Sequence, residues 1–252
     1  MSTAKKLVTV VIPCYNEGAS IANVIHGFKC TSIADDYFNF DILVIDNNSK
    51  DNTSEEAKNA GARVITETKQ GKGHAIRTGF NNIHPSAEYV VMLDGDDTYR
   101  PEEVLRMLEP LHHNFCDVVV GSRLGGKIRG DAMHSVNRAG NWLYTHLVRL
   151  VYSVNITDVL SGYFAWKRPV VENLAPNLVS SGFAIEMEMI TKMSKMGYEI
   201  YSVPISYNLR AGESHLRPFH DGALILQMLG RNIIWKHQQS KIIENLELKE
   251  NT

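Results

Sequence analysis

Short apolar runs alternate with helix-like segments over the first 120 residues, and this alternation restricts the chain to few folds. The apolar runs cover residues 7–12, 41–45, 62–66, 89–93 and 117–120. The segments between them show helical periodicity over 17–29, 53–60, 72–83 and 102–112. Strands and helices that alternate in this way predict an α/β fold, with a mostly parallel, Rossmann-like sheet flanked by helices.

The second half of the chain departs from this rhythm. Residues 122–135 are rich in glycine and basic side chains, and the stretch over 155–183 is expected to be irregular. The remaining expectations are helices over 136–154, 184–196 and 219–237 and a strand over 199–203. With 252 residues and no internal repeat or linker, the chain is expected to form a single domain.

Three carboxylates, Asp94, Asp96 and Asp97, follow directly after the apolar run over 89–93. Ligands of open α/β sheets bind at the carboxyl ends of the strands, and Gly95 permits close approach of backbone and ligand. Carboxylates this close repel one another unless a cation lies between them. Mg²⁺ or Mn²⁺, held by one or two carboxylates and by substrate phosphates, is the usual arrangement. The alternative is a solvated acidic turn before the next helix.

Charge, cysteine spacing and hydropathy limit the partners and the compartment that are expected for this chain. The net charge of −2 indicates that the chain as a whole is not a nucleic-acid binder. The three cysteines have no metal-ligand spacing, which predicts structural thiols in a reducing compartment. No stretch approaches the roughly 18 uncharged apolar residues of a spanning helix, so any membrane contact is expected to be peripheral or through a membrane partner protein.

The sequence lacks three common nucleotide-binding motifs. Pro13-Cys14-Tyr15-Asn16-Glu17 stands where a dinucleotide fold has Gly-x-Gly-x-x-Gly. Gly71-Lys72-Gly73 lacks the remaining residues of a P-loop. The Gly-rich loop with Arg that a nucleotidyltransferase has after its first strand is also missing.

Three motifs in the first half resemble those of the family-2 glycosyltransferases, which have the GT-A fold. They are Val-Ile-Pro-Cys-Tyr-Asn-Glu over 11–17, Ile-Asp-Asn-Asn-Ser-x-Asp-x-Thr over 45–53, and Asp-Gly-Asp over 94–96. Gly-Ser-Arg over 121–123 and Asp-Val-x-Ser-Gly-Tyr over 158–163 resemble the polyprenyl-phosphate sugar transferases, such as dolichol-phosphate mannose synthase. The resemblance runs from about residue 8 to residue 217.

This resemblance implies an inverting, metal-dependent hexosyltransferase that moves a sugar from a nucleotide diphosphate to a polyprenyl or dolichyl phosphate. It also implies a catalytic domain over 1–240, with a nucleotide-binding half over 1–121, an acceptor half over 122–240 and a polar tail over 241–252. The enzyme is expected to lie peripherally at the cytoplasmic face of a membrane.

The resemblance also implies a set of donor contacts. Asp94 and Asp96 are expected to hold Mg²⁺ or Mn²⁺, and the segment over 210–217 is expected to close over the donor. The remaining nucleotide-binding residues are expected to be Pro13, Tyr15, Glu17, Asp46, Lys72, Gly95, Arg210, Ser214 and His215.

Four acidic residues and Arg77 also have structural interpretations. Asp46 and Glu17 have local alternatives, an Asx turn and a first-turn acid of the following helix. Glu186 and Glu188 are both interpreted as structural, and Glu186 is the better candidate for the site. Arg77 is interpreted as part of a solvated helix face.

The expected acceptor needs positioning more than activation. A phosphate monoester has a second pKa near 6, so it is largely a dianion at neutral pH and needs no essential general base. Cationic side chains that orient it are therefore expected. Arg123, also expected to be catalytic, is the first candidate for this contact, followed by Arg138 and Ser161. Basic and aromatic side chains of the helix over 136–154 predict contact with anionic lipid headgroups.

The sugar and the nucleotide are less constrained. A uridine-diphosphate hexose or N-acetylhexosamine is favoured as the donor. One alternative is a dolichyl-phosphate mannosyltransferase that uses guanosine-diphosphate mannose. The others are a soluble sugar transferase for polysaccharide or protein, and a non-catalytic nucleotide-sugar binder.

Overall fold

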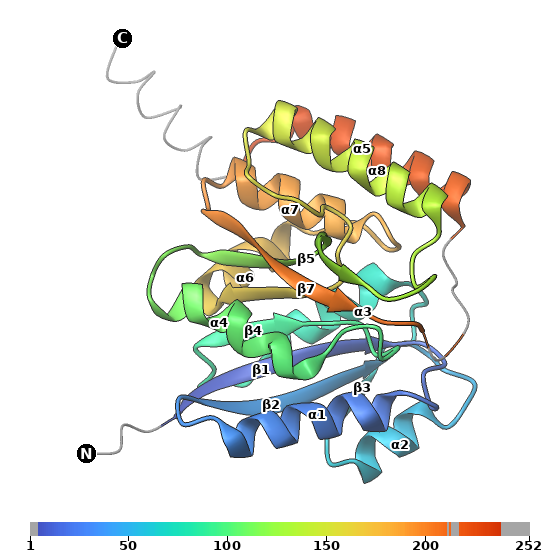
Figure 1. Cartoon of the computed structure of the whole chain (residues 1–252), viewed down its shortest axis with the longest axis vertical. Helices are drawn as coiled ribbons and strands as arrows, with labels where there is room; N and C mark the ends of the chain where they lie inside the picture. Colours follow the sequence, from blue (N-terminus) through green and yellow to red (C-terminus); the bar gives the residue numbers. More distant parts are fainter. Residues whose placement is uncertain (1–4, 211, 213–216, 238–252) are drawn as a thin grey trace.

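The computed structural model describes residues 5–210, 212 and 217–237, and within this part the chain forms one seven-stranded sheet with helices on both faces (Figure 1). The strand order is β3-β2-β1-β4-β6-β5-β7. The strands are β1 (Lys6–Cys14), β2 (Phe38–Asp46), β3 (Arg63–Thr66), β4 (Tyr89–Met92), β5 (Val118–Ile128), β6 (Phe164–Lys167) and β7 (Ile200–Tyr207). The helices are α1 (Ile21–Ala34), α2 (Thr53–Asn59), α3 (Lys72–Phe80), α4 (Val104–His112), α5 (Ser135–Tyr152), α6 (Arg168–Leu174), α7 (Ile185–Lys195) and α8 (Pro218–Ile233).

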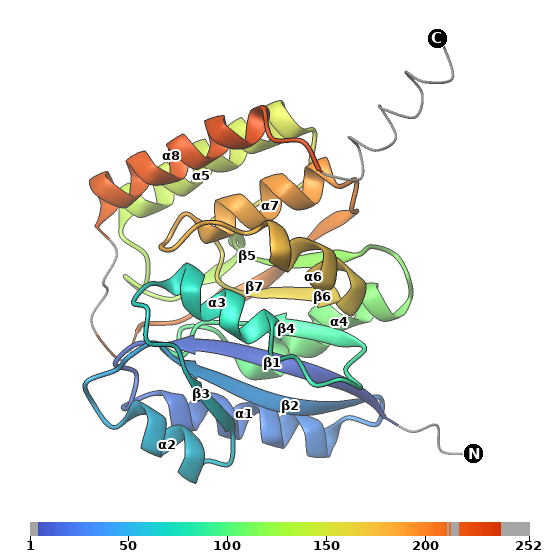
Figure 2. The ribbon, with the colours of Figure 1, turned by 180° about the vertical axis from the view of Figure 1, so that it is seen from behind.

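Two hydrophobic cores lie on opposite faces of this sheet. Helices α1, α2 and α4 cover one face, and α3, α6 and α7 cover the other (Figures 1 and 2). Successive side chains of a strand point to opposite faces, so Val10 and Ile12 join the first core while Val11 joins the second. Burial on both faces explains why these strands read as continuous apolar runs.

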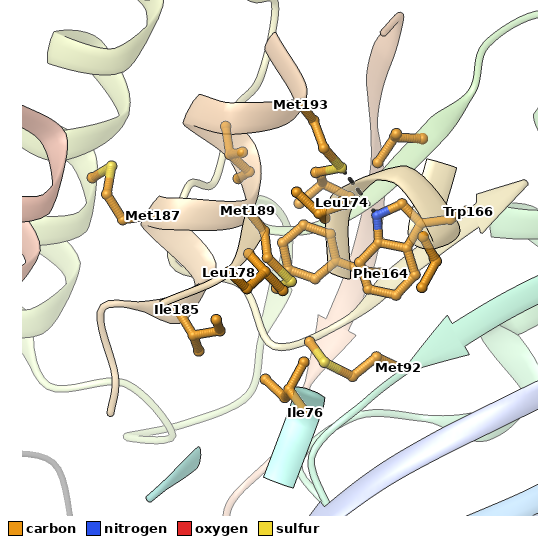
Figure 3. Close-up of a cluster of buried hydrophobic side chains, with 14 of the residues drawn as sticks. Ile76, Met92, Phe164, Trp166, Leu174, Leu178, Ile185, Met187, Met189 and Met193 are labelled. Carbon is orange, nitrogen blue, oxygen red and sulfur yellow. Dashed lines mark hydrogen bonds between the residues drawn. The ribbon is translucent and has the colours of Figure 1, made fainter. Parts of the chain in front are cut away.

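The second core is built around the aromatic residues of β6. The rings of Phe164 and Trp166 stack with centroids 5.1 Å apart, and the indole N–H of Trp166 points at the Met193 sulfur at 3.3 Å (Figure 3). Residues of α3, α6 and α7 surround them. This core therefore joins the centre of the sheet to the helix that carries Glu186.

The structure confirms the single-domain, mostly parallel α/β fold and corrects one region of it. The expectation that 155–183 is irregular was wrong, because Phe164–Lys167 forms β6 and Arg168–Leu174 forms α6. Strand β6 lies antiparallel to both β4 and β5. Four residues buried on both faces are too few to show a strand period.

Helices α5 and α8 lie side by side as an outer layer over α7 (Figures 1 and 2). The Tyr144 hydroxyl donates to the Gly222 carbonyl at 3.0 Å, and the Tyr152 hydroxyl donates to the Leu229 carbonyl at 2.8 Å. Two hydrogen bonds eight residues apart along α5 thus fix the pair of helices. In the part of the chain that the structure describes, no helix is both long enough and apolar enough to span a bilayer.

Candidate active site

A cavity of about 640 Å³ opens at the carboxyl edge of β1, β2 and β4. Its wall on the side of the sheet includes Pro13, Cys14, Tyr15, Glu17, Asn47, Gly71, Lys72, Asp94, Gly95 and Arg210. Its wall on the side of the outer helices includes the loop over 179–184 and, from α8, Asp221, Leu224, Gln227, Met228 and Arg231, with Arg217 and His220 beside them. A wall of acidic and cationic side chains thus meets a wall of apolar and basic side chains that also contains Asp221.

Lys72 connects two carboxylates beside this cavity. Its ammonium nitrogen lies 2.6 Å from Asp94 Oδ1 and 2.6 Å from Glu186 Oε1. Burial alone would lower the pKa of Lys72, but the two carboxylates raise it above its ordinary value. The pKa of Glu186 is raised by burial, and Lys72 opposes that shift only in part. The lysine therefore remains charged between two closely placed acids.

Arg210 makes a similar connection around Asp96. Its Nη2 lies 2.6 Å from Glu17 Oε1, and its Nε lies 3.3 Å from Asp96 Oδ2 without the geometry of a hydrogen bond. Thr98 fixes the other oxygen of Asp96 with its hydroxyl at 2.6 Å and its backbone N–H at 3.1 Å. Burial and then the charge of Asp94 raise the pKa of Asp96.

The donor set beside the cavity fits a divalent cation. Within the described residues, no group of three or more His, Cys, Asp or Glu side chains is arranged to hold a metal alone. Asp94 and Asp96 offer hard carboxylate oxygens in a region where burial and mutual repulsion already disfavour charge on Asp96. Two carboxylates supplemented by phosphate oxygens are the set that Mg²⁺ commonly uses.

The motif over 158–163 needs glycine at position 162, because Asp94 lies directly beside it. A Cβ atom at Gly162 would lie 2.3 Å from Asp94 Oδ2, which is closer than such atoms approach in proteins. The Gly162 N–H donates to the Tyr99 hydroxyl at 2.8 Å. The motif therefore places the backbone at Gly162 close to the Asp94 carboxylate.

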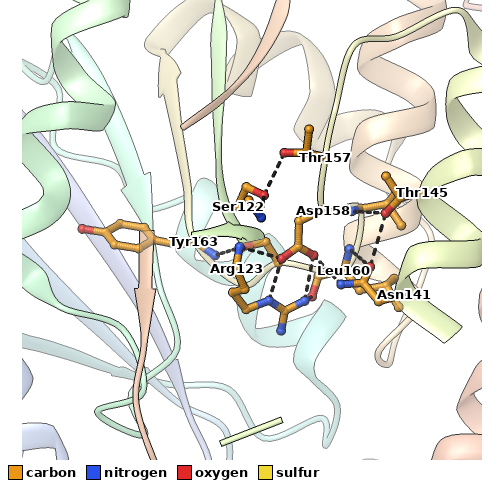
Figure 4. A network of polar contacts seen from close by, with 12 residues as sticks. Ser122, Arg123, Asn141, Thr145, Thr157, Asp158, Leu160 and Tyr163 are labelled. Carbon is orange, nitrogen blue, oxygen red and sulfur yellow. Dashed lines mark hydrogen bonds and ion pairs between the residues drawn. The ribbon is translucent and has the colours of Figure 1, made fainter. Parts of the chain in front are cut away.

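The same motif anchors Arg123 through Asp158 (Figure 4). Arg123 Nε and Nη2 donate to the two oxygens of Asp158 at 2.8 and 2.9 Å, and Nη2 also donates to the Leu160 carbonyl at 2.6 Å. The Asn141 amide donates to Asp158 at 2.6 Å. Burial would raise the pKa of Asp158, but the Arg123 guanidinium holds it below its ordinary value.

The three acceptor residues expected from the sequence are not among the described residues that line the cavity. Arg123 is committed to Asp158, and Arg138 is exposed on α5. Ser161 is fully buried, and its hydroxyl accepts the N–H of Tyr163 at 3.2 Å. Their contact with an acceptor stays a prediction.

Most of the expected donor residues do meet at the cavity. Among the expected nucleotide-binding and metal residues, Pro13, Tyr15, Glu17, Lys72, Asp94, Gly95 and Arg210 line it, whereas Asp96 is buried and is not among the lining residues. Asp46 is buried, and its carboxylate accepts the N–H of Ser49 at 3.0 Å, which is the Asx-type alternative. Ser214 and His215 lie outside the described residues. Arg77 donates to the Ser180 carbonyl at 2.6 Å, so it is not the solvated residue that we expected.

The sequence did not identify the role of Asn47 in shaping this cavity. The Asn47 side-chain amide donates to the carbonyls of Glu67 and Lys69 at 3.1 and 2.8 Å. Its oxygen accepts the N–H of Gly71 at 2.7 Å. Asn47 thus fixes the chain that leads to Lys72.

The loop over 179–184 was also missed. A Cβ atom at Gly73 would lie 2.1 Å from the Ser180 carbonyl oxygen, so glycine is required for this contact. The Gly73 N–H donates to the Ser181 carbonyl at 2.9 Å. The second glycine of Gly71-Lys72-Gly73 was the available signal, since it marks a close backbone approach.

Comparison with known proteins places this architecture in a family. The model of "Glycosyl transferase family 2" matches residues 9–175. Glycosyltransferase AglJ of Haloferax volcanii is 36% identical over 226 residues, covering 89% of this chain and 71% of the relative. The dolichyl-phosphate hexose transferase of the same organism is 31% identical over 226 residues, covering 89% of this chain and 91% of the relative.

A solved structure shows the same fold. Glucosyl-3-phosphoglycerate synthase from Mycobacterium tuberculosis, in complex with Mn²⁺, uridine diphosphate and phosphoglyceric acid, is similar with a TM-score of 0.72 at 22% identity. The alignment covers 94% of this chain and 82% of that chain. The motifs, the sheet and the sequence relatives agree, and the chain belongs to glycosyl transferase family 2 as a glycosyltransferase with the GT-A fold.

Proposed function

We propose that this enzyme transfers a hexose or N-acetylhexosamine from a nucleotide diphosphate sugar, preferably a uridine diphosphate sugar, to a polyprenyl or dolichyl phosphate. One observation carries the proposal. A single cavity combines the Asp94, Lys72 and Arg210 cluster with a wall of apolar and basic residues from α8. The names of two similar proteins support it, because one is a dolichyl-phosphate hexose transferase and the other binds Mn²⁺ and uridine diphosphate.

The cluster at the sheet edge suits a diphosphate leaving group. Asp94 and Asp96 would hold Mg²⁺ or Mn²⁺, which neutralises the charge that develops on the departing nucleotide. Lys72 and Arg210 add two cationic side chains at the same place. Tyr15 and Glu17 line the cavity where β1 ends, within the segment that the family resemblance assigns to the nucleoside.

The chemistry then needs a well-placed nucleophile. An oxygen of the lipid phosphate attacks the anomeric carbon opposite the leaving group, and the bond from that carbon to the diphosphate oxygen breaks, so the configuration inverts. The acceptor is already anionic, so it needs no proton removed. Arg217 and Arg231 line the cavity and are two further cationic candidates for the acceptor phosphate, in addition to the predicted Arg123 and Arg138.

The outer helices suit a peripheral place at the cytoplasmic face of a membrane. Large apolar side chains are exposed on both, including Trp142, Leu143 and Leu150 on α5 and Phe219 and Leu226 on α8. Basic Arg138, Arg149 and Arg231 are exposed on the same two helices. Apolar side chains that enter the headgroup region beside basic residues give binding to anionic bilayers.

Radiolabelled transfer tests the function. The enzyme is incubated with labelled uridine- or guanosine-diphosphate sugars, Mn²⁺ and polyprenyl phosphate, and the label is followed into the organic phase. We expect label in lipid from a uridine donor, and none with the Asp96→Asn variant. Label only in aqueous acceptors would overturn the lipid acceptor. Label in lipid only from guanosine-diphosphate mannose would overturn the choice of donor.

A further inference from the structure

Glu186 is a buried carboxylate that the reaction described above does not use. It lies in the first turn of α7, and its side chain is 6% exposed. Its Oε1 lies 2.6 Å from the Lys72 ammonium, which lies at the same distance from Asp94. Lys72 and Asp94 line the cavity, so Glu186 holds the lysine next to an expected metal ligand.

The backbone around this contact is firmly fixed. Gly73 brings the first turn of α3 against the carbonyls of Ser180 and Ser181, just before α7. The carboxylate of Glu188 accepts the N–H groups of Val179 and Ser180 at 3.0 and 2.7 Å. The loop is therefore held from both helices, which fixes the backbone that carries Lys72 relative to the backbone that carries Glu186.

We propose that Glu186 is a positioning residue that retains the Lys72 ammonium at the cavity when Asp94 exchanges this lysine for the divalent cation. The lysine then presents its remaining N–H donors to the diphosphate of the donor. The proposal rests on the function proposed above, because it needs a cation at Asp94.

The charges around Lys72 explain why it needs Glu186 as a second partner. An ammonium group has three N–H donors, and in this structure it is placed between two carboxylates. A cation held by Asp94 would repel Lys72 and would remove one of its two carboxylate partners. Lys72 is only 15% exposed, so without another carboxylate it would be driven to move toward solvent or to lose its proton, since an unpaired charge in a largely buried place is unfavourable. Glu186 supplies that second partner.

Arg210 is placed at Asp96, the other expected metal ligand, in the same way as Lys72 is placed at Asp94. It lies between Asp96 and Glu17, so each expected ligand of the cation is paired with a side-chain cation that has a second carboxylate. Both side-chain cations thus keep a counter-charge when the divalent cation binds.

Two binding measurements test the proposal. Electron paramagnetic resonance measures the affinity for Mn²⁺ in the absence of substrate, and a separate titration measures the affinity for uridine diphosphate. Residues that act through a metal ligand commonly change metal affinity by about 10- to 100-fold, and we expect Glu186→Gln to weaken Mn²⁺ binding within that range. Glu186→Asp keeps the charge and should lose less. We also expect Glu186→Gln to raise KM for the donor and leave KM for the lipid phosphate unchanged. Glu172→Gln removes an exposed partner of Arg168 and serves as a control without effect.

A double-mutant cycle separates positioning from a general loss of negative charge. In the Lys72→Met background, adding Glu186→Gln should cause no further loss of Mn²⁺ affinity. An equal loss in both backgrounds, or wild-type affinity in Glu186→Gln, would overturn the proposal. Wild-type protein that binds neither Mn²⁺ nor uridine diphosphate would instead contradict the proposed function itself.

Discussion

Replacing Asp158 by asparagine removes the negative charge from the buried ion pair between Arg123 and Asp158. The side chains of Arg123 and Asp158 are 11% and 0% exposed. Asp158 accepts hydrogen bonds from the backbone N–H, Nε and Nη2 of Arg123 and from Asn141. An asparagine would turn an NH₂ group toward some of these donors and leave the guanidinium without a counter-charge.

The expected cost follows from this burial. Breaking a buried ion pair by removing one partner costs about 3–5 kcal/mol. A typical domain has a total stability of about 5–15 kcal/mol, so Asp158→Asn should lose a large share of it. The loss should appear as a lower urea midpoint with an unchanged m-value.

A second pair in the same chain provides a matched control. Arg63 Nε and Nη2 donate to the two oxygens of Asp41 at 2.8 Å each, but the Arg63 side chain is 44% exposed. Asp41→Asn should therefore cost about 0.2–1 kcal/mol, as exposed pairs do. Urea unfolding followed by circular dichroism measures both variants. Equal losses for Asp158→Asn and Asp41→Asn would refute the claim that burial makes the Arg123 pair important.

Three further predictions concern the cavity and the outer helices. Gly162→Ala places a Cβ atom 2.3 Å from Asp94 Oδ2 and should therefore displace the Asp94 carboxylate. Because a displacement of a catalytic group by about 1 Å can lower the rate about 100-fold, kcat should fall by about that factor while the circular dichroism spectrum is unchanged. A wild-type kcat would contradict this. Burial and Asp94 raise the pKa of Asp96, so its charged form destabilises the ligand-free protein as pH rises above about 4. Asp96→Asn should therefore raise Tm at pH 7, and this gain in Tm should vanish toward pH 4. A lower Tm of the variant at pH 7 would contradict this. Leu150→Glu on α5 should reduce flotation with phosphatidylglycerol vesicles, while Ile33→Glu on α1, which is similarly exposed, should not; equal flotation of the two variants would argue against the outer-helix face.

The sequence predicted the features that depend on local periodicity. Val10 to Ile12 are apolar on both faces of a strand, and the helical segments repeat their apolar residues at helical spacing. The acids after β4 were placed at the ligand edge because parallel strands end together there. These inferences need only neighbouring residues and a rule about sheets.

Features that depend on tertiary pairing were not predictable in this way. Arg123 was expected to be available to a phosphate, but its partner Asp158 lies 35 residues away, and spacing does not reveal such a pair. The pairing of Glu186 with Lys72 was not predictable, because it depends on the contact between Gly73 and Ser180. Strand β6 was missed because four residues are too few to show a period.

The central claim is that a divalent cation at Asp94 and Asp96 holds the diphosphate of the sugar donor. Anomalous scattering from crystals soaked with Mn²⁺ and uridine diphosphate measures this directly. We predict a manganese peak in contact with both carboxylates and with phosphate oxygens, beside Lys72. A diphosphate bound elsewhere, with no manganese at these acids, would contradict the account.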